Sequence, residues 1–260
     1  MRAVAVHPDV IVVTSRFWQT TCTAVRNGGE AFLIDSPVLP DELGALPMVL
    51  EQARFAPLNG LLVTHADWDH LLGRYAFPEA SLACGETTAA RLAAEPGAAQ
   101  SELAAFDDEN YVQRPGPLSL PVAQALPVPG FCGVGDAELE LHPADGHTAD
   151  GTAFLVPWAE TLVCGDYISP VEIPWISATG SLGSYLATLA RLQSLVERVQ
   201  TVVPGHGAPQ DRDAALTIID ADIAYLEALR DTGAEAVLPE GRDNGAMRKI
   251  HAETVGRVSG

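Results

Sequence analysis

Two histidines and two aspartates stand close together directly after an apolar run. The run is Leu-Leu-Val-Thr at 61–64, and the polar side chains that follow it are His65, Asp67, Asp69 and His70. Such a run is typical of a buried strand, whereas carboxylates and imidazoles are costly to bury unless they are paired or bind a metal. Imidazole nitrogen and carboxylate oxygen suit zinc, iron or manganese. This segment therefore predicts a metal site at the end of a buried strand.

Three further strand-like segments end in residues of the same kind. "LELHPADGHT" carries His147, "TLVCGD" ends at Asp166, and "TVVPGHG" carries His206. Glycines flank all three residues, and glycine permits the tight turns that aim a short side chain inward. Loops that follow strands are where a rigid scaffold places chemistry. We expect the four segments to contribute to one site.

The bulk composition excludes several classes of partner. The 260 residues include 34 acidic and 15 basic side chains, for a net charge of −19, and the basic residues are spread along the chain. Such a surface repels a nucleic-acid backbone, and no eighteen-residue apolar stretch predicts a membrane span. The N-terminal residues suggest a strand and not a signal peptide, and the four cysteines are far apart. We expect a cytoplasmic protein that acts on a small molecule.

The elements that must position these residues form two halves, each a set of strands followed by helices. Asn27-Gly28-Gly29 lies between two strand patterns and predicts a hairpin. Helices are expected at 47–55, with Pro47 in the first turn, at 182–199, and at 211–230 with Asp211 as the cap.

We expect one domain over residues 1–235. The prolines and glycines of 96–135 predict an irregular insert or lid inside it. Residues 236–260 are expected to form a polar tail with one helix at 246–257.

Taken in order, the motifs H-x-[HED]-x-D-H, G-H-T, G-D and G-H-G resemble those of the metallo-β-lactamase superfamily, over roughly residues 10–232. The resemblance implies an α/β fold, a four-layer αββα sandwich with metals at one edge between the two sheets. It also implies two divalent metal ions, zinc first, with iron or manganese as alternatives. Carried over position by position, it assigns His65, Asp67 and His147 to the first metal and Asp69, His70 and His206 to the second, with Asp166 bridging both.

Asp67 departs from the family pattern, because most hydrolases of the family have histidine there. Three interpretations are open. Asp67 could bind the first metal through oxygen, could be too short to reach it, or could orient His65 or His147 from outside. We adopt direct ligation, because a lost site would not need His147 and Asp166 in their motif contexts.

The function that the resemblance implies is hydrolysis of a small ester, lactone or thioester by a metal-bridging hydroxide. Asp69, already among the ligands, and Tyr167 are the candidate catalytic residues; Tyr167 directly follows Asp166 and could donate to a substrate oxyanion. The β-lactamases of the family generally lack an aspartate at the bridging position, so Asp166 disfavours antibiotic hydrolysis. The alternatives are a di-iron oxidoreductase of the flavodiiron type and a non-catalytic scaffold with a degraded metal site. Dimers are common in the family, so a homodimer is allowed.

Overall fold

The strands form two sheets that lie face to face. A computed structural model describes residues 1–55 and 57–258. The first sheet has seven strands in the order β1 to β7, antiparallel from β1 to β4 and parallel from β4 to β7. They are β1 (Arg2–His7), β2 (Val10–Thr14), β3 (Thr21–Asn27), β4 (Glu30–Asp35), β5 (Gly60–Val63), β6 (Leu82–Gly85) and β7 (Gln124–Leu126).

The second sheet has six strands in the order β13-β12-β11-β10-β9-β8. Its pairs are antiparallel except for the parallel pair of β11 and β12. The strands are β8 (Gly130–Val134), β9 (Ala137–Pro143), β10 (Thr152–Val156), β11 (Thr161–Val163), β12 (Thr201–Val203) and β13 (Gln210–Asp211).

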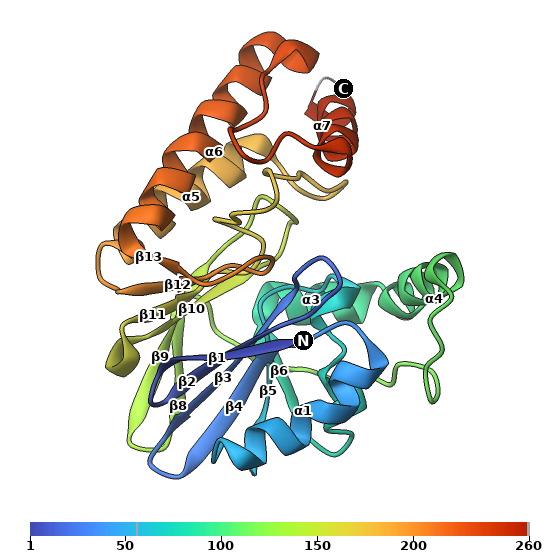
Figure 1. Ribbon diagram of the computed structural model, residues 1–260, viewed down its shortest axis with the longest axis vertical. Coiled ribbons are helices and arrows are strands. Elements are labelled where there is room, and N and C mark those ends of the chain that lie inside the picture. The colour runs from blue at the N-terminus through green and yellow to red at the C-terminus, as the bar shows by residue number, and fades with distance from the viewer. Residues whose placement is uncertain (56, 259–260) are drawn as a thin grey trace.

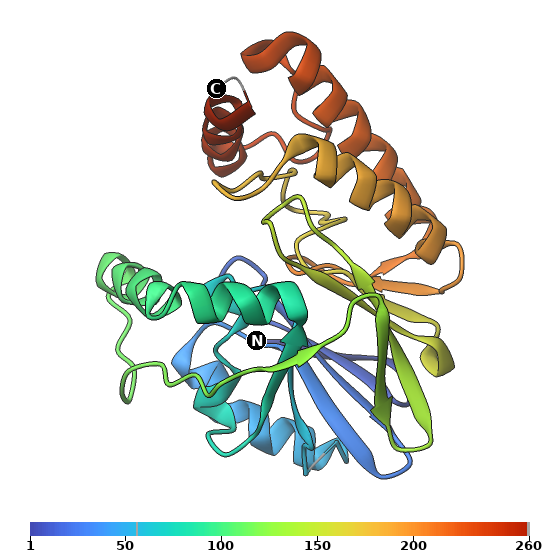
Figure 2. The same ribbon diagram turned by 180° about the vertical axis from the view of Figure 1, so that it is seen from behind.

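Helices cover the outer face of each sheet (Figures 1 and 2). The first sheet carries α1 (Pro40–Gln52), α2 (Gly73–Ala76), α3 (Glu86–Ala94) and α4 (Ala98–Asn110). The second is covered by α5 (Leu182–Val196) and α6 (Arg212–Thr232), and α7 (Gly245–Val258) stands apart from the sheet and packs against the 3₁₀ turn η3 (Gly233–Glu235). Further short 3₁₀ turns lie at η1 (Trp68–His70) and η2 (Pro157–Ala159). The predicted four-layer αββα sandwich is confirmed.

The layers explain why the central strands are apolar on both faces. Val12, Ile34 and Leu62 of the first sheet pack against Leu141 and Phe154 of the second in a core between the sheets. Residues on the other face of each strand pack under the helices in two further cores. A strand covered on both sides reads as a continuous apolar run, as 61–64 does.

The first helix begins earlier than predicted. Pro40 and not Pro47 occupies the first turn of α1, and Pro47 lies inside the helix. The prediction of a helix at 47–55 is therefore wrong at both ends. The helix tolerates the internal proline because Leu43, Leu46 and Leu50 lie on one face and are fully buried in the core.

The segment 96–135 is less irregular than its prolines suggest. It holds α4, and it supplies one edge strand to each sheet, β7 and β8. Leu103 and Phe106 of α4 are buried, which anchors the helix on the first half. The long stretch without helix or strand is confined to 111–123, so the expectation of an irregular insert over the whole segment is corrected.

The C-terminal segment holds α7, close to the predicted range of 246–257. Met247 is buried in the core of the second half, and Ile250 packs against that core. In the described part of the chain, none of the helices is long and apolar enough to cross a bilayer.

Candidate metal centre

The strand ends bring the seven predicted ligands together at one edge of the sandwich. His65 follows β5, and Asp69 and His70 lie on η1. In the second half the ligands come from three separate connections, with His147 between β9 and β10, Asp166 after β11 and His206 after β12. A bridge between Thr20 and His206 ties the two sheets together beside them.

The first ligand group consists of His65, Asp67 and His147. Oδ2 of Asp67 lies 3.6 Å from Nε2 of His65 and 3.3 Å from Nε2 of His147. Oδ2 of Asp166 lies 3.6 Å and 3.4 Å from the same two nitrogens. Asp67 is therefore long enough to present an oxygen to this group.

The second ligand group consists of Asp69, His70 and His206. Oδ2 of Asp69 lies 3.6 Å from Nε2 of His70 and 3.5 Å from Nε2 of His206. Asp166 also faces this group, with Oδ1 3.2 Å from His70 Nε2 and Oδ2 3.4 Å from His206 Nε2. Asp166 thus stands between the two groups and is shared by both.

The spacing and chemistry of these donors fit metal ions. Ligands about 2.0–2.1 Å from a tetrahedral cation lie roughly 3.3–3.4 Å from one another, close to the observed separations. Nε2 of His65, Nε2 of His70 and Oδ1 of Asp166 are buried and make no hydrogen bond to any described residue. Buried polar atoms without partners are rare and costly, so their convergence fits a site that could hold cations.

Each histidine points Nε2 toward the centre because a neighbour engages its other ring nitrogen, an arrangement that fixes the ring for metal binding. Three of the Nδ1 atoms have hydrogen-bond partners, which are Thr64 Oγ1 at 3.0 Å for His65, the Trp175 carbonyl at 2.9 Å for His147 and the Trp18 carbonyl at 3.1 Å for His206. Nδ1 of His70 makes an ion-pair contact with Asp35 Oδ2 at 3.1 Å, without hydrogen-bond geometry.

The turn that carries Asp166 and the turn that carries His206 are packed against each other. Gly205 lies beside the Asp166 carboxylate, and a Cβ at position 205 would collide with Oδ1 of Asp166. The glycine of the G-H-G motif is therefore required to make room for the shared ligand.

The centre is strongly coupled electrostatically. Burial lowers the pKa of His147 and of His206, but the carboxylates around them outweigh it and raise the two pKa values to about 9 and about 10. Burial raises the pKa of Asp67 and of Asp166, but the facing histidines hold both pKa values well below the usual range. In the metal-free protein, protons on imidazole therefore take the place of cations.

Three residues that support the site were not predicted from the sequence. Asp35 ends β4, the parallel neighbour of β5, and accepts hydrogen bonds from the backbone N–H and the hydroxyl of Thr64 at 2.8 and 2.9 Å. Asp150 accepts a hydrogen bond from the Ala66 N–H at 2.9 Å. Arg91 on α3 lies 2.9 Å from Oδ1 of Asp67. Of these three residues, only Asp35 could have been found from the sequence, because it is a carboxylate at the end of an apolar strand.

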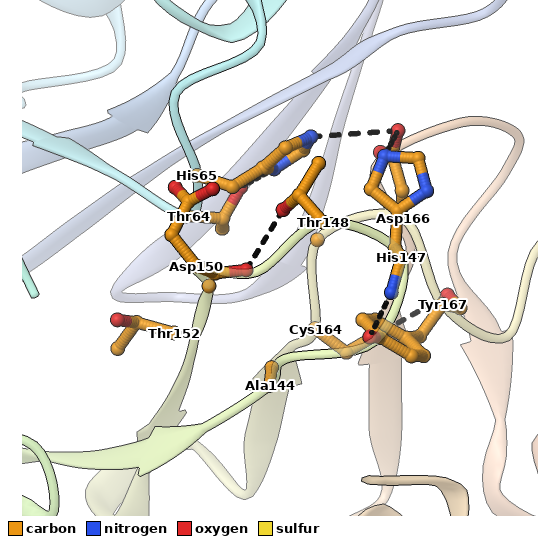
Figure 3. Close-up of a pocket in the computed structure, with 12 residues that line it drawn as sticks. Thr64, His65, Ala144, His147, Thr148, Asp150, Thr152, Cys164, Asp166 and Tyr167 are labelled. Carbon is orange, nitrogen blue, oxygen red and sulfur yellow. Dashed lines mark hydrogen bonds and ion pairs between the residues drawn. The ribbon is translucent and has the colours of Figure 1, made fainter. Parts of the chain in front are cut away.

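Contrary to the prediction, Tyr167 does not face the candidate metal centre. Its side chain is buried, and its hydroxyl donates to the Asp145 carbonyl at 2.8 Å and accepts from the His147 N–H at 2.9 Å. Figure 3 shows the ring on the backbone side of His147, beside a space of about 10 Å³ that is large enough for about one water molecule. The expectation of a donor to the substrate oxyanion is corrected to support of the loop that carries His147.

A cavity of about 1080 Å³ opens onto both ligand groups. Asp67, Asp69, His147, Asp166 and His206 line its floor. Its walls are largely apolar and carry charged side chains from several helices. The wall residues include Trp18, Trp68, Ile168, Ile173, Trp175, Met247 and Ile250, with Glu102 and Glu109 on α4 and Lys249, Glu253 and Arg257 on α7.

Comparisons with known proteins agree with this architecture. Residues 15–206 match the family described as "Metallo-beta-lactamase superfamily". A metallo-beta-lactamase family protein from Thermus thermophilus has a TM-score of 0.69 at 21% identity, over 97% of this chain and 93% of that one. A metallo-beta-lactamase from Pontibacter korlensis has a TM-score of 0.61 at 19% identity, over 84% of this chain and 98% of that one. The DIM-1 metallo-beta-lactamase has a TM-score of 0.59 at 17% identity, over 87% of this chain and 97% of that one. These structural likenesses show the fold alone. A search of curated proteins finds no significant match.

Proposed function

This chain belongs to the metallo-β-lactamase superfamily, and we propose that it is a binuclear metal-dependent hydrolase of a small ester, lactone or thioester. The observation that carries the proposal is the pair of ligand groups that share Asp166 at the floor of the cavity. Each group offers two imidazole nitrogens and carboxylate oxygen, the donor set that zinc takes in hydrolytic sites.

Two sets of residues would each hold one cation. His65, Asp67 and His147 would hold one cation, and Asp69, His70 and His206 the other, with Asp166 between them. Two adjacent cations, when bound, supply a water of lowered pKa and positive charge for the oxyanion of the substrate. The carboxylates of Asp67, Asp69 and Asp166 balance part of that charge, which permits dications at a largely buried position.

The walls of the cavity support a small, largely uncharged substrate. Trp18 and Trp68, whose ring centroids lie 5.6 Å apart, form an apolar side. Trp175 lies on the wall beside His147, 5.2 Å between ring centroids. Apolar walls with a few convergent polar groups suit a small molecule. The glutamates of α4 and the net charge of −19 disfavour a polyanion.

One observation favours a second candidate, a di-iron oxidoreductase. Asp67 adds a carboxylate oxygen to the first ligand group, and oxygen-rich sites suit iron better than a site of imidazoles alone. A non-catalytic scaffold is disfavoured because all seven predicted ligand side chains converge, and five of them line the cavity.

Elemental analysis of untagged protein, purified without added metal or chelator, tests the proposal first. We expect about two zinc ions per chain, together with hydrolysis of p-nitrophenyl esters, γ-lactones or acyl thioesters that stops on chelation and returns with zinc. Two iron atoms and turnover of oxygen or peroxide would support the oxidoreductase instead. Protein that holds no metal, and takes up none when zinc is added, would contradict both.

A further inference from the structure

The carboxylate of Asp67 divides its two oxygens between different neighbours. Oδ2 faces the first ligand group, 3.6 Å from Nε2 of His65 and 3.3 Å from Nε2 of His147. Oδ1 lies 2.9 Å from Nη1 of Arg91. One oxygen is therefore free to bind a cation, while a guanidinium already holds the other.

Arg91 is itself held in place by Asp150. The Nη1 group that contacts Asp67 also donates to Oδ1 of Asp150 at 2.9 Å. The side chain of Asp150 is 2% exposed. Its other oxygen accepts a hydrogen bond from the N–H of Ala66, the residue before Asp67. Arg91 and Asp150 together thus fix both the backbone that leads into Asp67 and the direction of its side chain.

The charges explain why such a partner is needed. A carboxylate at position 67 adds a negative charge beside Asp166 and Asp150, whereas a neutral imidazole would add none. Removing one partner from a buried ion pair leaves an uncompensated charge, which is costly. With Oδ1 bound to Arg91, Asp67 cannot chelate through both oxygens. The pair offers one donor atom and no net charge, as a neutral imidazole does.

We propose that Arg91 is a positioning residue that makes Asp67 a one-oxygen ligand of the first metal position, so that Asp67 and Arg91 act as one unit. The inference rests on the metal-binding part of the proposed function. It has a specific consequence, which is that Arg91 becomes dispensable for metal binding once residue 67 is an imidazole.

A double-mutant cycle tests this consequence. Wild type, Arg91→Met, Asp67→His and the double variant are each titrated with zinc against a chromophoric chelator and with Co²⁺, whose visible spectrum reports coordination. In the Asp67 background we expect Arg91→Met to weaken the first site about 10- to 100-fold, the usual cost of losing an outer partner of a ligand, and to change the Co²⁺ spectrum. In the Asp67→His background the same change should alter affinity less than about threefold.

Two further variants separate positioning from folding. Arg91→Lys keeps the positive charge and should recover part of the lost affinity. Arg114→Met removes another buried arginine, whose Nε lies 2.8 Å from Oδ2 of Asp107 away from both ligand groups, and should leave both sites unchanged. Thermal unfolding of the chelator-treated variants measures any general loss of stability.

The outcomes are distinct. Equal losses in the two backgrounds, or no loss in either, would overturn the inference while leaving the proposed function intact. Wild-type protein that binds neither zinc nor Co²⁺ would overturn both together. Loss of affinity only in the Asp67 background, with partial recovery in Arg91→Lys, would support the proposal that Asp67 and Arg91 act as one unit.

Discussion

The two halves of the molecule build the candidate metal centre in different ways. The N-terminal half supplies its four ligands from the single stretch 65–70, where one turn and η1 set their relative positions. The C-terminal half supplies one ligand from each of three strand connections, at His147, Asp166 and His206. Local turn geometry therefore fixes the first set, and the order of β9 to β12 in the sheet fixes the second.

The supports behind the ligands differ in the same way. In the N-terminal half, side chains hold the ligands, with Asp35 at His70 and Arg91 at Asp67. In the C-terminal half, the carbonyls of Trp175 and Trp18 hold His147 and His206. A side-chain support can be removed by one substitution, whereas a backbone carbonyl survives any change of side chain. We therefore expect single substitutions of supporting residues to damage the N-terminal half more.

The largest effect is expected where the two halves meet. Asp166→Asn should weaken the binding of both metals by well over the roughly 100-fold cost of losing an outer partner, because a neutral amide bridges two dications poorly. Hydrolysis should fall with metal content while the circular dichroism spectrum stays that of wild type. Two retained zinc ions and full turnover would show that Asp166 does not bridge.

Acid should weaken metal binding through histidines of both halves, because the carboxylates around His70 outweigh its burial and raise its pKa well above the usual value too. Because the pKa values of His147 and His206 are raised to about 9 and about 10 in the metal-free protein, both rings hold protons at neutral pH that a metal must displace. Affinity must then rise with pH below these values. Each displaced proton contributes up to about tenfold per pH unit, so the zinc dissociation constant should increase at least about 100-fold from pH 8 to pH 6. Chelator competition at several pH values measures it, and a flat profile would contradict the expectation.

Asp35→Asn tests the side-chain support of the N-terminal half. The amide should orient His70 less well and lose one of the two bonds to Thr64, so we expect zinc affinity at the second ligand group to fall about 10- to 100-fold. Asp41→Asn is the control, because Asp41 is exposed and pairs with Arg16 at the surface. If both variants kept the affinity of wild type, the Asp35 contact would have no part in metal binding.

Tyr167→Phe should have the smallest effect on turnover. Losing the hydroxyl leaves the His147 N–H without this acceptor and should lower the free energy of unfolding by about 1–3 kcal/mol, while kcat falls less than about tenfold. A hydroxyl that stabilised the oxyanion directly would instead cost about 100- to 1,000-fold in kcat. Parallel measurement of unfolding and kcat therefore separates the two roles.

How much of the site could be predicted follows from the same contrast between the halves. The H-x-D-x-D-H set is local, so its spacing in the sequence is also its spacing in space. Asp35 and Arg91 lie far along the chain from the ligands they support, and they become neighbours through the parallel pairing of β4 with β5 and the packing of α3. No local pattern marks such a contact.

The fold shows the same limit. The hairpin around Asn27-Gly28-Gly29 and the Asp211 cap of α6 depend on adjacent residues, and both are found where predicted. The predicted start of α1 is wrong because proline favours the first turn of a helix, and Pro47 was assigned to that position. Burial of Leu43, Leu46 and Leu50, a tertiary effect, keeps Pro47 inside the helix.

The position of Lys249 on the α7 wall of the cavity makes the protein suited to selective labelling. Lys249 is the only lysine in the sequence, and its side chain is exposed while it lines the space above the metal centre. Apart from the α-amino group, an amine-selective fluorophore therefore has one place to attach. A dye attached there would sense the entry of small molecules without any engineered residue, which gives a direct optical screen for compounds that enter the cavity.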